Sequence, residues 1–188
     1  MSRFRSKSTC SGDRMPAIRF VSIACLETCI ILGVQKTTPE HPPLIRDVRS
    51  DEIQKLYDID QICFPVHVAY SRVELLFFLN HGSSISKVAE REGSVLGFAI
   101  GQVKAHEHAH VITIDVIPEA RRGRVGRALM ETLHAEFRAR GAVQASLEVD
   151  TDNEAAQQFY IGLGYRRTDF LRGYYNGHGN AYRMVLDL

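Results

Sequence analysis

Residues 110–130 read HVITIDVIPEARRGRVGRALM, and this stretch decides the fold. The β-branched run 110–117 is stopped by Pro118, which predicts a buried strand that ends there. From residue 123 to 140, apolar side chains recur every four positions and predict a helix with one buried face: Val125, Leu129, Leu133 and Phe137. A short loop with four arginines and two glycines joins the two elements: Arg121, Arg122, Gly123, Arg124, Gly126 and Arg127.

A strand, a basic glycine-containing loop and a helix start form an anion site by geometry. The first backbone N–H groups of a helix lack intrahelical partners and carry the positive end of its dipole. Glycine lets a ligand approach the backbone closely. Neither Gly-Lys-Ser/Thr nor G-x-G-x-x-G is present, which excludes a Walker loop and a dinucleotide fingerprint. Three occupants of this loop remain possible: a phosphate-bearing ligand, a nucleic acid, or only water around a basic helix start.

Composition favours a small ligand over a nucleic acid. The 188 residues suffice for one domain, and the formal net charge is only +1. A dedicated nucleic-acid binder usually has a clear basic excess. Basic residues gather locally instead.

The first forty-three residues are expected to be a loosely ordered extension. Residues 20–34, FVSIACLETCIILGV, resemble the apolar part of a signal peptide, but Glu27 interrupts them and the run is short for a membrane span. An exported or anchored protein is the alternative. TTPEHPP (37–43) is typical of a linker, so the folded domain is expected to cover 44–188.

Four cysteines show neither paired zinc spacing nor a dense disulfide framework: Cys10, Cys25, Cys29 and Cys63. This usage indicates a reducing compartment, and we expect a cytoplasmic protein.

The remaining elements follow from capping and periodicity. The alternating residues LIRDV (44–48) predict a strand. Ser50 or Asp51 is expected to cap the helix that follows. This helix is expected to end at about Cys63 and to have Ile62 in its apolar stripe. Ser71 is expected to cap the next helix, and a hairpin follows with its turn at 92–93. AVQASLEVD (142–150) alternates, with Val143 on the apolar face; Thr151 and Glu154 have capping-box spacing for the next helix, and two final strands end the chain.

The stretch VIPEARRGRVGRALM (116–130) resembles the acetyl-CoA signature Q/R-x-x-G-x-G/A of the GCN5-related N-acetyltransferase (GNAT) family. Arg121 takes the first position and Gly126 the last, while Arg124 stands where the first glycine is expected. LEVDTDNEAAQQFYIGLGYRR (147–167) and YYNGHGNAYRMVLDL (174–188) are similar to segments of the ribosomal-protein-alanine N-acetyltransferases; His178 and Gly179-Asn180 depart from the usual residues. The resemblance implies an α/β GNAT fold, with a mixed central sheet of about six to seven strands and about four flanking helices.

The resemblance also implies a reaction, in which an amine attacks the thioester of acetyl-CoA directly, without a metal. Glu148 matches the family's catalytic base and Tyr160 its general acid. The alternatives are an arginine-paired glutamate and a tyrosine packed in the core. Asn153 is expected either to bind the cofactor's arm or to serve only as a helix-start residue.

Further positions are assigned by the same resemblance. The backbone of residues 114–116 is expected to pair with the cofactor's pantetheine amides, and the loop with its phosphates: Ile114, Asp115, Val116, Arg121, Arg122, Gly123, Arg124, Val125, Gly126 and Arg127. Asp115 is either a second carboxylate near the amine or a structural partner. Four aromatic residues are expected to wall the acceptor slot or to cover the core edge: Phe64, Tyr70, Tyr174 and Tyr175.

Three histidines alternate at 106, 108 and 110, a pattern that superficially suits zinc. No fourth ligand is evident. We therefore expect an exposed hairpin tip rather than a metal site.

The sequence thus predicts an acetyl-CoA-dependent N-acetyltransferase acting on protein N-termini, as a monomer or weak homodimer, without nucleic-acid or membrane partners. A GNAT enzyme acting on a small amine is the first alternative. A nucleic-acid-binding module and a CoA-binding domain without turnover are the others.

Overall fold

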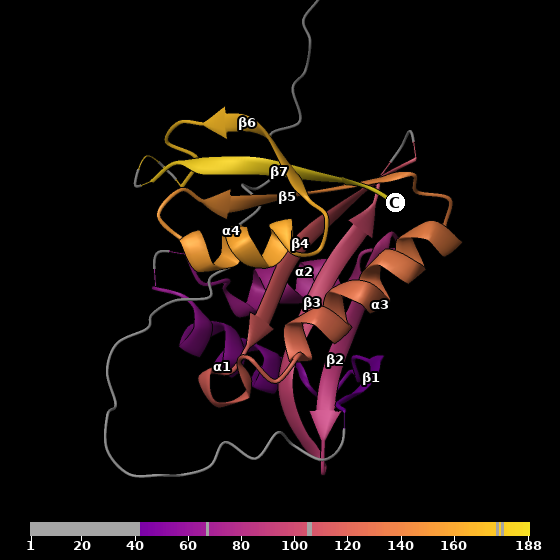
Figure 1. Ribbon diagram of the computed structural model, residues 1–188. Helices are drawn as coiled ribbons and strands as arrows, with labels where there is room; N and C mark the ends of the chain where they lie inside the picture. Colours follow the sequence, from indigo (N-terminus) through magenta and orange to yellow (C-terminus); the bar gives the residue numbers. More distant parts are fainter. Residues whose placement is uncertain (1–41, 67, 105–106, 176, 178) are drawn as a thin grey trace, which may run out of the picture.

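A seven-stranded sheet organises the chain, in the order β1-β2-β3-β4-β5-β7-β6 (Figure 1). The computed structural model describes residues 42–66, 68–104, 107–175, 177 and 179–188. Its strands are β1 (Leu44–Asp47), β2 (Ser84–Arg91), β3 (Ser94–Val103), β4 (His108–Val116), β5 (Gln144–Asp150), β6 (Arg166–Leu171) and β7 (Ala181–Asp187). The helices are α1 (Ile53–Cys63), α2 (Arg72–Asn80), α3 (Val125–Ala139) and α4 (Glu154–Ile161), with a 3-10 turn, η1 (Pro118–Ala120), before α3. The predicted α/β fold and element order are confirmed.

Among the strands of the described residues, only the β4–β5 pair is parallel. All other neighbouring strands run antiparallel, including β5–β7 and β7–β6. A parallel pair needs a crossover, and α3 provides it. The final strand β7 inserts between β5 and β6, an arrangement that element order does not specify.

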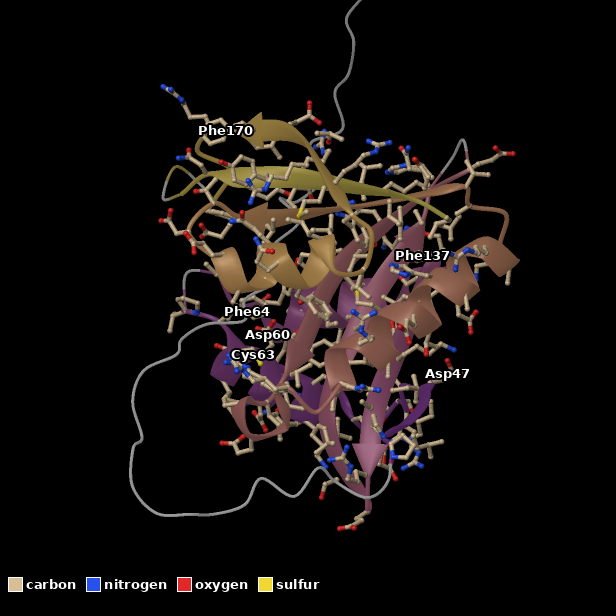
Figure 2. The ribbon with its side chains drawn as sticks, viewed as in Figure 1. Asp47, Asp60, Cys63, Phe64, Phe137 and Phe170 are labelled. Carbon is tan, nitrogen blue, oxygen red and sulfur yellow. The ribbon has the colours of Figure 1, made fainter. Side chains whose placement is uncertain are left out.

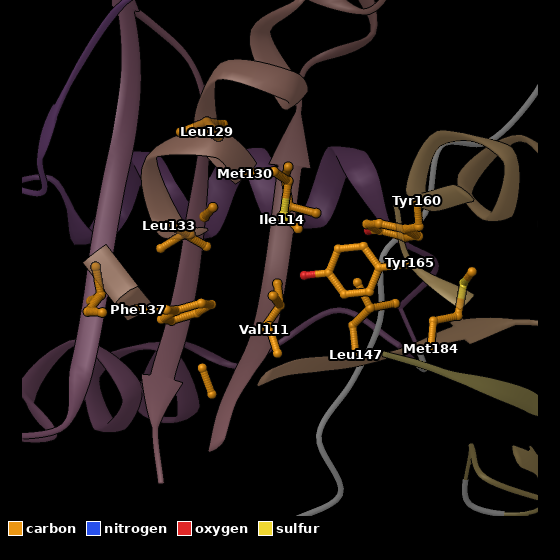
Figure 3. Close-up of a cluster of buried hydrophobic side chains, with 14 of the residues drawn as sticks. Val111, Ile114, Leu129, Met130, Leu133, Phe137, Leu147, Tyr160, Tyr165 and Met184 are labelled. Atoms are coloured by element: carbon orange, nitrogen blue, oxygen red, sulfur yellow. The ribbon is translucent and has the colours of Figure 1, made fainter. Parts of the chain in front are cut away.

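Helices cover both faces of the sheet and make two cores. On one face α3 and α4 pack over a cluster that includes Leu129, Phe137, Leu147 and Tyr160, part of which Figure 3 shows. On the other face α1 and α2 pack over a second cluster that includes Leu56, Leu75 and Phe98. We call these sides the α3/α4 face and the α1/α2 face.

Strand β4 is bent where it passes under α3. Its register with β3 moves from Ile100↔Thr113 to Gly101↔Val111, so Ile112 is an extra residue and forms a β-bulge. A bulge bends the strand and increases its twist. Gly101 permits the close packing at this point, because a Cβ there would lie 2.4 Å from the Phe137 ring.

Several local predictions were wrong. Helix α1 is preceded by Glu52 without a side-chain cap, not by Ser50 or Asp51, and Ile62 is exposed. Asn153, not Thr151, caps α4, and Val143 is exposed because it precedes β5. The Ser71 capping box on α2 and the 92–93 turn are as predicted.

Within the described residues, no helix is both long and apolar enough to cross a membrane. The expected extension lies almost wholly in residues 1–41, outside the described part of the chain.

Candidate active site

An opening in the sheet separates β4 from β5. The two strands pair only from His108↔Gln144 to His110↔Ser146, near their amino ends. Beyond that point β5 continues along β7, and Figure 1 shows the β5–β7–β6 group turning away from the direction of β2–β4. The unpaired stretch therefore lies next to the carboxyl half of β4.

Backbone groups of β4 line this opening. Ile117 donates its N–H to Leu96 of β3. Since successive residues of a strand direct their N–H and C=O groups to alternate edges, those of Ile114 and Val116 face β5. The Val116 carbonyl accepts hydrogen bonds from Arg121 Nε at 3.0 Å and from Cys63 Sγ at 3.4 Å. The Val116 N–H and both backbone groups of Ile114 remain on the open edge, where the sequence predicts a pantetheine arm.

The loop before α3 curls its backbone around the helix start. Arg122 and Arg124 both adopt the left-handed conformation, with φ of 63° and 61°. Backbone N–H groups in such a turn converge on one point and form an anion-binding concavity. The first N–H groups of α3 add to it, because they have no intrahelical partner. Residues 122–127 are thus suited to hold phosphate groups.

The arginines of this loop differ in their positions. Arg121 folds back onto β4 through its bond to Val116, so its side chain braces the strand end. Arg127 donates to the Gly162 carbonyl at the end of α4 and also pairs with Glu131. Arg122 and Arg124 are exposed beside the helix start. Gly126 lies between Phe159 and Ile114, where an added Cβ would make ordinary contacts at 3.4 and 3.7 Å.

Glu148 is 7% exposed and lies on the α1/α2 face of β5. Its Oε1 accepts from Arg183 Nε at 3.0 Å, and its Oε2 accepts from the Tyr174 hydroxyl at 3.1 Å. His110 Nε2 lies 3.3 Å from the same Oε2. The arginine pairing that the sequence left as an alternative is therefore present, and hydrogen bonds hold the carboxylate from β7 and from the loop before β7.

The expectation of an exposed histidine tip was wrong for two of the three histidines. His110 is 3% exposed and packs inside the sheet, and His108 is partly buried. Both ring systems contact Ser146 Oγ, at 2.9 Å from His110 Nδ1 and 2.8 Å from His108 Nε2. His106 lies outside the described residues. Among those described, no group of three or more His, Cys, Asp or Glu side chains could hold a metal ion.

Tyr160 lies fully buried on the α3/α4 face, among Tyr165, Phe159 and the side chains of β4 and β5 (Figure 3). Its hydroxyl has no hydrogen-bond partner among the described residues. Burial raises its pKa well above the usual value, and Tyr165 and Asp115 add to this effect. A buried hydroxyl without a partner is uncommon in native proteins, and here it keeps its proton at neutral pH. The aromatic packing does not by itself account for this hydroxyl.

Asp115 is fully buried on the α1/α2 face, where it accepts from Thr113 Oγ1 at 2.8 Å. Burial, together with the nearby charge of Asp60, raises the pKa of Asp115 well above its usual value. Asp60 also accepts from the Tyr70 N–H at 2.7 Å. Figure 2 shows Asp60 and Cys63 on α1, beside the carboxyl end of β4. Its contacts make Asp115 a structural partner of α1; its backbone N–H and C=O face β3, away from the opening.

The four aromatic candidates gather in one cluster on the α1/α2 face: Phe64, Tyr70, Tyr174 and Tyr175. Phe64 and Tyr70 are buried among α1 and α2 side chains, whereas Tyr174 stacks edge-on against Tyr175 and reaches Glu148. Tyr174 is thus the member of the set in contact with the candidate base. Asn153 caps α4 by accepting from the Ala156 N–H at 3.0 Å, so its helix-start role is the one seen here.

Sequence reasoning missed three residues at this site: His110, Ser146 and Arg183. Ser146 and Glu148 share a strand face, and alternation alone marks them as neighbours on β5. Arg183 lies 35 positions from Glu148, and no local pattern links them.

Comparisons with known proteins agree with this geometry. The sequence pattern of the Acetyltransferase (GNAT) family matches residues 53–165. The chain is 31% identical over 148 residues to the [ribosomal protein bS18]-alanine N-acetyltransferase of Escherichia coli (strain K12), a match that covers 77% of this chain and 97% of the relative. It is 26% identical over 159 residues to an N-alpha-acetyltransferase of Sulfurisphaera tokodaii, over 77% of this chain and 92% of the relative.

A solved structure agrees as well. Ard1 from Thermoplasma volcanium superposes with a TM-score of 0.73 at 29% identity, over 79% of this chain and 99% of the other. These findings confirm the resemblance stated from the sequence. The protein belongs to the GNAT family of acetyltransferases.

Proposed function

We propose that this acetyltransferase transfers the acetyl group of acetyl-CoA to the N-terminal α-amino group of a protein. The relatives named above support the acceptor class. The observation that carries the proposal is the position of Glu148 and Tyr160 on opposite faces of the sheet, beside one opening. An acceptor can approach from the α1/α2 face while a proton donor waits on the α3/α4 face.

The residues present fit acetyl-CoA. The left-handed loop at 122–124 and the start of α3 suit its phosphates, and the open edge of β4 suits a chain with amide groups. Tyr160, whose hydroxyl has no hydrogen-bond partner among the described residues, belongs to the same buried cluster as Ile114 of that edge. Bound acetyl-CoA supplies an activated thioester, and its thiolate leaves when the acyl group is transferred.

The side chains divide the proton transfers between them. The acceptor arrives mainly as an ammonium ion, and Glu148 removes a proton from it so that the neutral amine can attack. Tyr160 holds its proton on Oη and donates it to the departing thiolate. An α-amino group has a reference pKa of about 7.7–8.0 against about 10.4 for lysine, so a carboxylate base suits an N-terminus better.

Thiol release from acetyl-CoA tests the proposal. The acceptors are short peptides with free Ala, Ser, Met or Gly N-termini. N-blocked lysine peptides and polyamines are tested separately as alternative acceptors. Release with free N-termini alone supports the proposal. Release with polyamines alone would assign the enzyme to small amines.

Variants test the two residues. Glu148→Gln and Tyr160→Phe should each lower kcat by about a hundredfold or more while acetyl-CoA affinity stays within about twofold. Glu92→Gln, at an exposed turn, and Tyr57→Phe, on α1, are the matched controls and should behave as wild type. Unchanged turnover in Glu148→Gln would exclude it as the base.

A further inference from the structure

One carbonyl oxygen at the end of β4 receives donors from two other parts of the chain. Arg121, in the loop before α3, donates its Nε–H to the Val116 carbonyl at 3.0 Å. Cys63 Sγ, on α1, donates to the same oxygen at 3.4 Å (Figure 2). Burial raises the pKa of Cys63 to about 12, so the thiol keeps its proton and remains a donor. The Val116 carbonyl thus joins β4 to α1 and to the basic loop.

The peptide group between Val116 and Ile117 is held on both sides. Its N–H, that of Ile117, donates to the Leu96 carbonyl at 3.0 Å. Its C=O accepts from Arg121 and Cys63. A peptide group is planar, so bonds on both sides fix its orientation. Because β3 and β4 pair up to this position, the backbone at Val116 has little freedom and its N–H is held toward the open edge.

The Val116 N–H lies on the open edge of β4, where the proposed function requires the acyl end of acetyl-CoA. A backbone N–H held in a fixed direction stabilises negative charge that develops on a carbonyl oxygen during acyl transfer. The Val116 C=O faces the same edge, and its negative end would oppose such charge if it were left free. Donors from Arg121 and Cys63 occupy it instead.

We infer that Arg121 is a positioning residue for acetyl transfer: its Nε–H holds the Val116 carbonyl and thereby keeps the Val116 N–H directed at the open edge of β4. This role differs from the phosphate contact that the sequence predicts for Arg121, because it depends on a hydrogen bond and not on the charge. The inference rests on acetyl-CoA lying along β4, as in the proposed function, but not on the identity of the acceptor.

Two substitutions separate the donor from the charge. Glutamine Nε2 stands as many bonds from Cβ as arginine Nε does, so Arg121→Gln keeps a donor for the Val116 carbonyl and removes the charge. Arg121→Met has a stem of similar length with neither donor nor charge. We expect kcat to fall by about tenfold in Arg121→Met and by no more than about threefold in Arg121→Gln. Arg138→Met, at an exposed position in the last turn of α3, is the matched control and should behave as wild type.

Binding of the nucleotide half of coenzyme A separates strand positioning from phosphate contact. The probe is ADP with the additional ribose phosphate of coenzyme A and without the pantetheine arm. Its dissociation constant, measured by isothermal titration, should stay within about threefold of wild type in both Arg121 variants, since only a screened charge is lost. Arg124→Gly removes an exposed guanidinium at the helix start and should weaken the same probe by about fivefold.

Amide hydrogen exchange in the free enzyme measures the strand end without turnover. The Ile117 N–H belongs to the fixed peptide group, so it should exchange about tenfold faster in Arg121→Met than in wild type. In Arg121→Gln its exchange should stay close to the wild-type rate. Amides of β2, which lies between β1 and β3, are the control, because their exchange reports the stability of the rest of the sheet.

The outcomes distinguish a strand support from a phosphate contact. A lower kcat and faster Ile117 exchange in Arg121→Met, both recovered in Arg121→Gln, support the positioning role. Wild-type kcat in Arg121→Met would overturn it, as would an equal loss of nucleotide affinity of about fivefold or more in both variants. If Arg121→Met does not fold, Arg121→Lys replaces it, since lysine keeps the charge but has a methylene where Nε stands; a rate in Arg121→Lys equal to or above that of Arg121→Gln would then overturn the role.

The test also stands apart from the choice of acceptor. Thiol release is measured with whichever acceptor the wild type uses, so a polyamine substrate would contradict the proposed N-terminal acceptor and leave the Arg121 comparison intact. If the wild type releases no thiol with any acceptor, the proposed function fails. Ile117 exchange then still decides whether Arg121 fixes the end of β4.

Discussion

At the scale of single residues, the loop before α3 shows what a sequence pattern does and does not determine. The resemblance located Arg124 at a position where glycine is usual, and the structure gives that position a φ of 61°. Glycine populates this region without a Cβ penalty, whereas other residues are disfavoured there. The pattern identified the position, but the conformation follows from how the loop joins β4 to α3.

Arg124→Gly should separate the backbone from the side chain. Relief of the left-handed strain offsets the extra freedom of glycine in the unfolded chain, so the free energy of unfolding should stay within about 0.5 kcal/mol. Loss of an exposed guanidinium beside the phosphates should weaken coenzyme A binding by about 1 kcal/mol, and less at high salt. Isothermal titration at two salt concentrations measures this. If wild type and Arg124→Gly bind coenzyme A with equal affinity at both salt concentrations, Arg124 does not contact phosphate.

Glu148 illustrates the same limit at the catalytic position. Alternation along residues 142–150 placed it opposite the apolar side chains of β5, which is correct. The pattern could not show that this polar face is itself buried, or that Arg183 and His110 meet the carboxylate there. Those contacts depend on strand pairings between distant segments.

At the scale of elements, helix and strand positions were largely predictable, as was the start of α2, but the starts of α1 and α4 were not. Hydrophobic periodicity located α1 and α3, because their buried faces repeat with the helical period, and capping residues located α2 and α4. The start of α4 was misjudged, since Thr151 and Glu154 have capping-box spacing but residues 151–152 form the turn after β5. The Asn153 side chain then lies closest to the free N–H groups of the helix.

Two variants at the start of α4 test this assignment. Asn153→Ala removes the acceptor for the Ala156 N–H and should lower the free energy of unfolding by about 1 kcal/mol. Thr151→Ala should change it by no more than about 0.5 kcal/mol, because the threonine makes no capping bond. Urea denaturation compares them. A larger loss in Thr151→Ala would restore the cap expected from the sequence.

At the scale of the whole molecule, local sequence patterns did not predict the strand order of the sheet or the opening between β4 and β5. Element order gave the α/β class, but it did not specify that β7 inserts between β5 and β6 or that β4 and β5 pair over only three positions. The pairing of β4 with β5 ends at His110, two residues before the bulge at Ile112 of β4. Family resemblance supplied what local patterns lacked.

The pH dependence of the free energy of unfolding is also a property of the whole molecule. Burial lowers the pKa of some groups and raises that of others, so their contributions oppose one another. Burial lowers the pKa of His134, which contacts the Tyr165 hydroxyl, to about 4. As the pH falls from about 7 to about 5, the unfolded chain takes up a proton at this residue and the folded chain does not, so stability is lost. The raised pKa of Asp115 acts the other way, since the folded state takes up that proton first.

His134→Gln isolates one of these contributions. The variant retains a hydrogen-bonding group but does not titrate. The free energy of unfolding of the wild type, measured by denaturation between about pH 7 and about pH 5, should fall more steeply with decreasing pH than that of the variant. Parallel curves would mean that His134 has the same pKa in the folded and unfolded chain.

The central claim is acetylation of a protein N-terminus by this GNAT enzyme, and one measurement tests it most directly. A peptide with a free Ala N-terminus and an internal lysine is incubated with the enzyme and acetyl-CoA, and fragmentation mass spectrometry locates the added acetyl group. The account predicts that the group is on the α-amine, that the lysine is unmodified, and that Glu148→Gln forms the product at least about a hundredfold more slowly. Acetylation of the lysine, or no acetylation of peptides together with rapid acetylation of a polyamine, would contradict it.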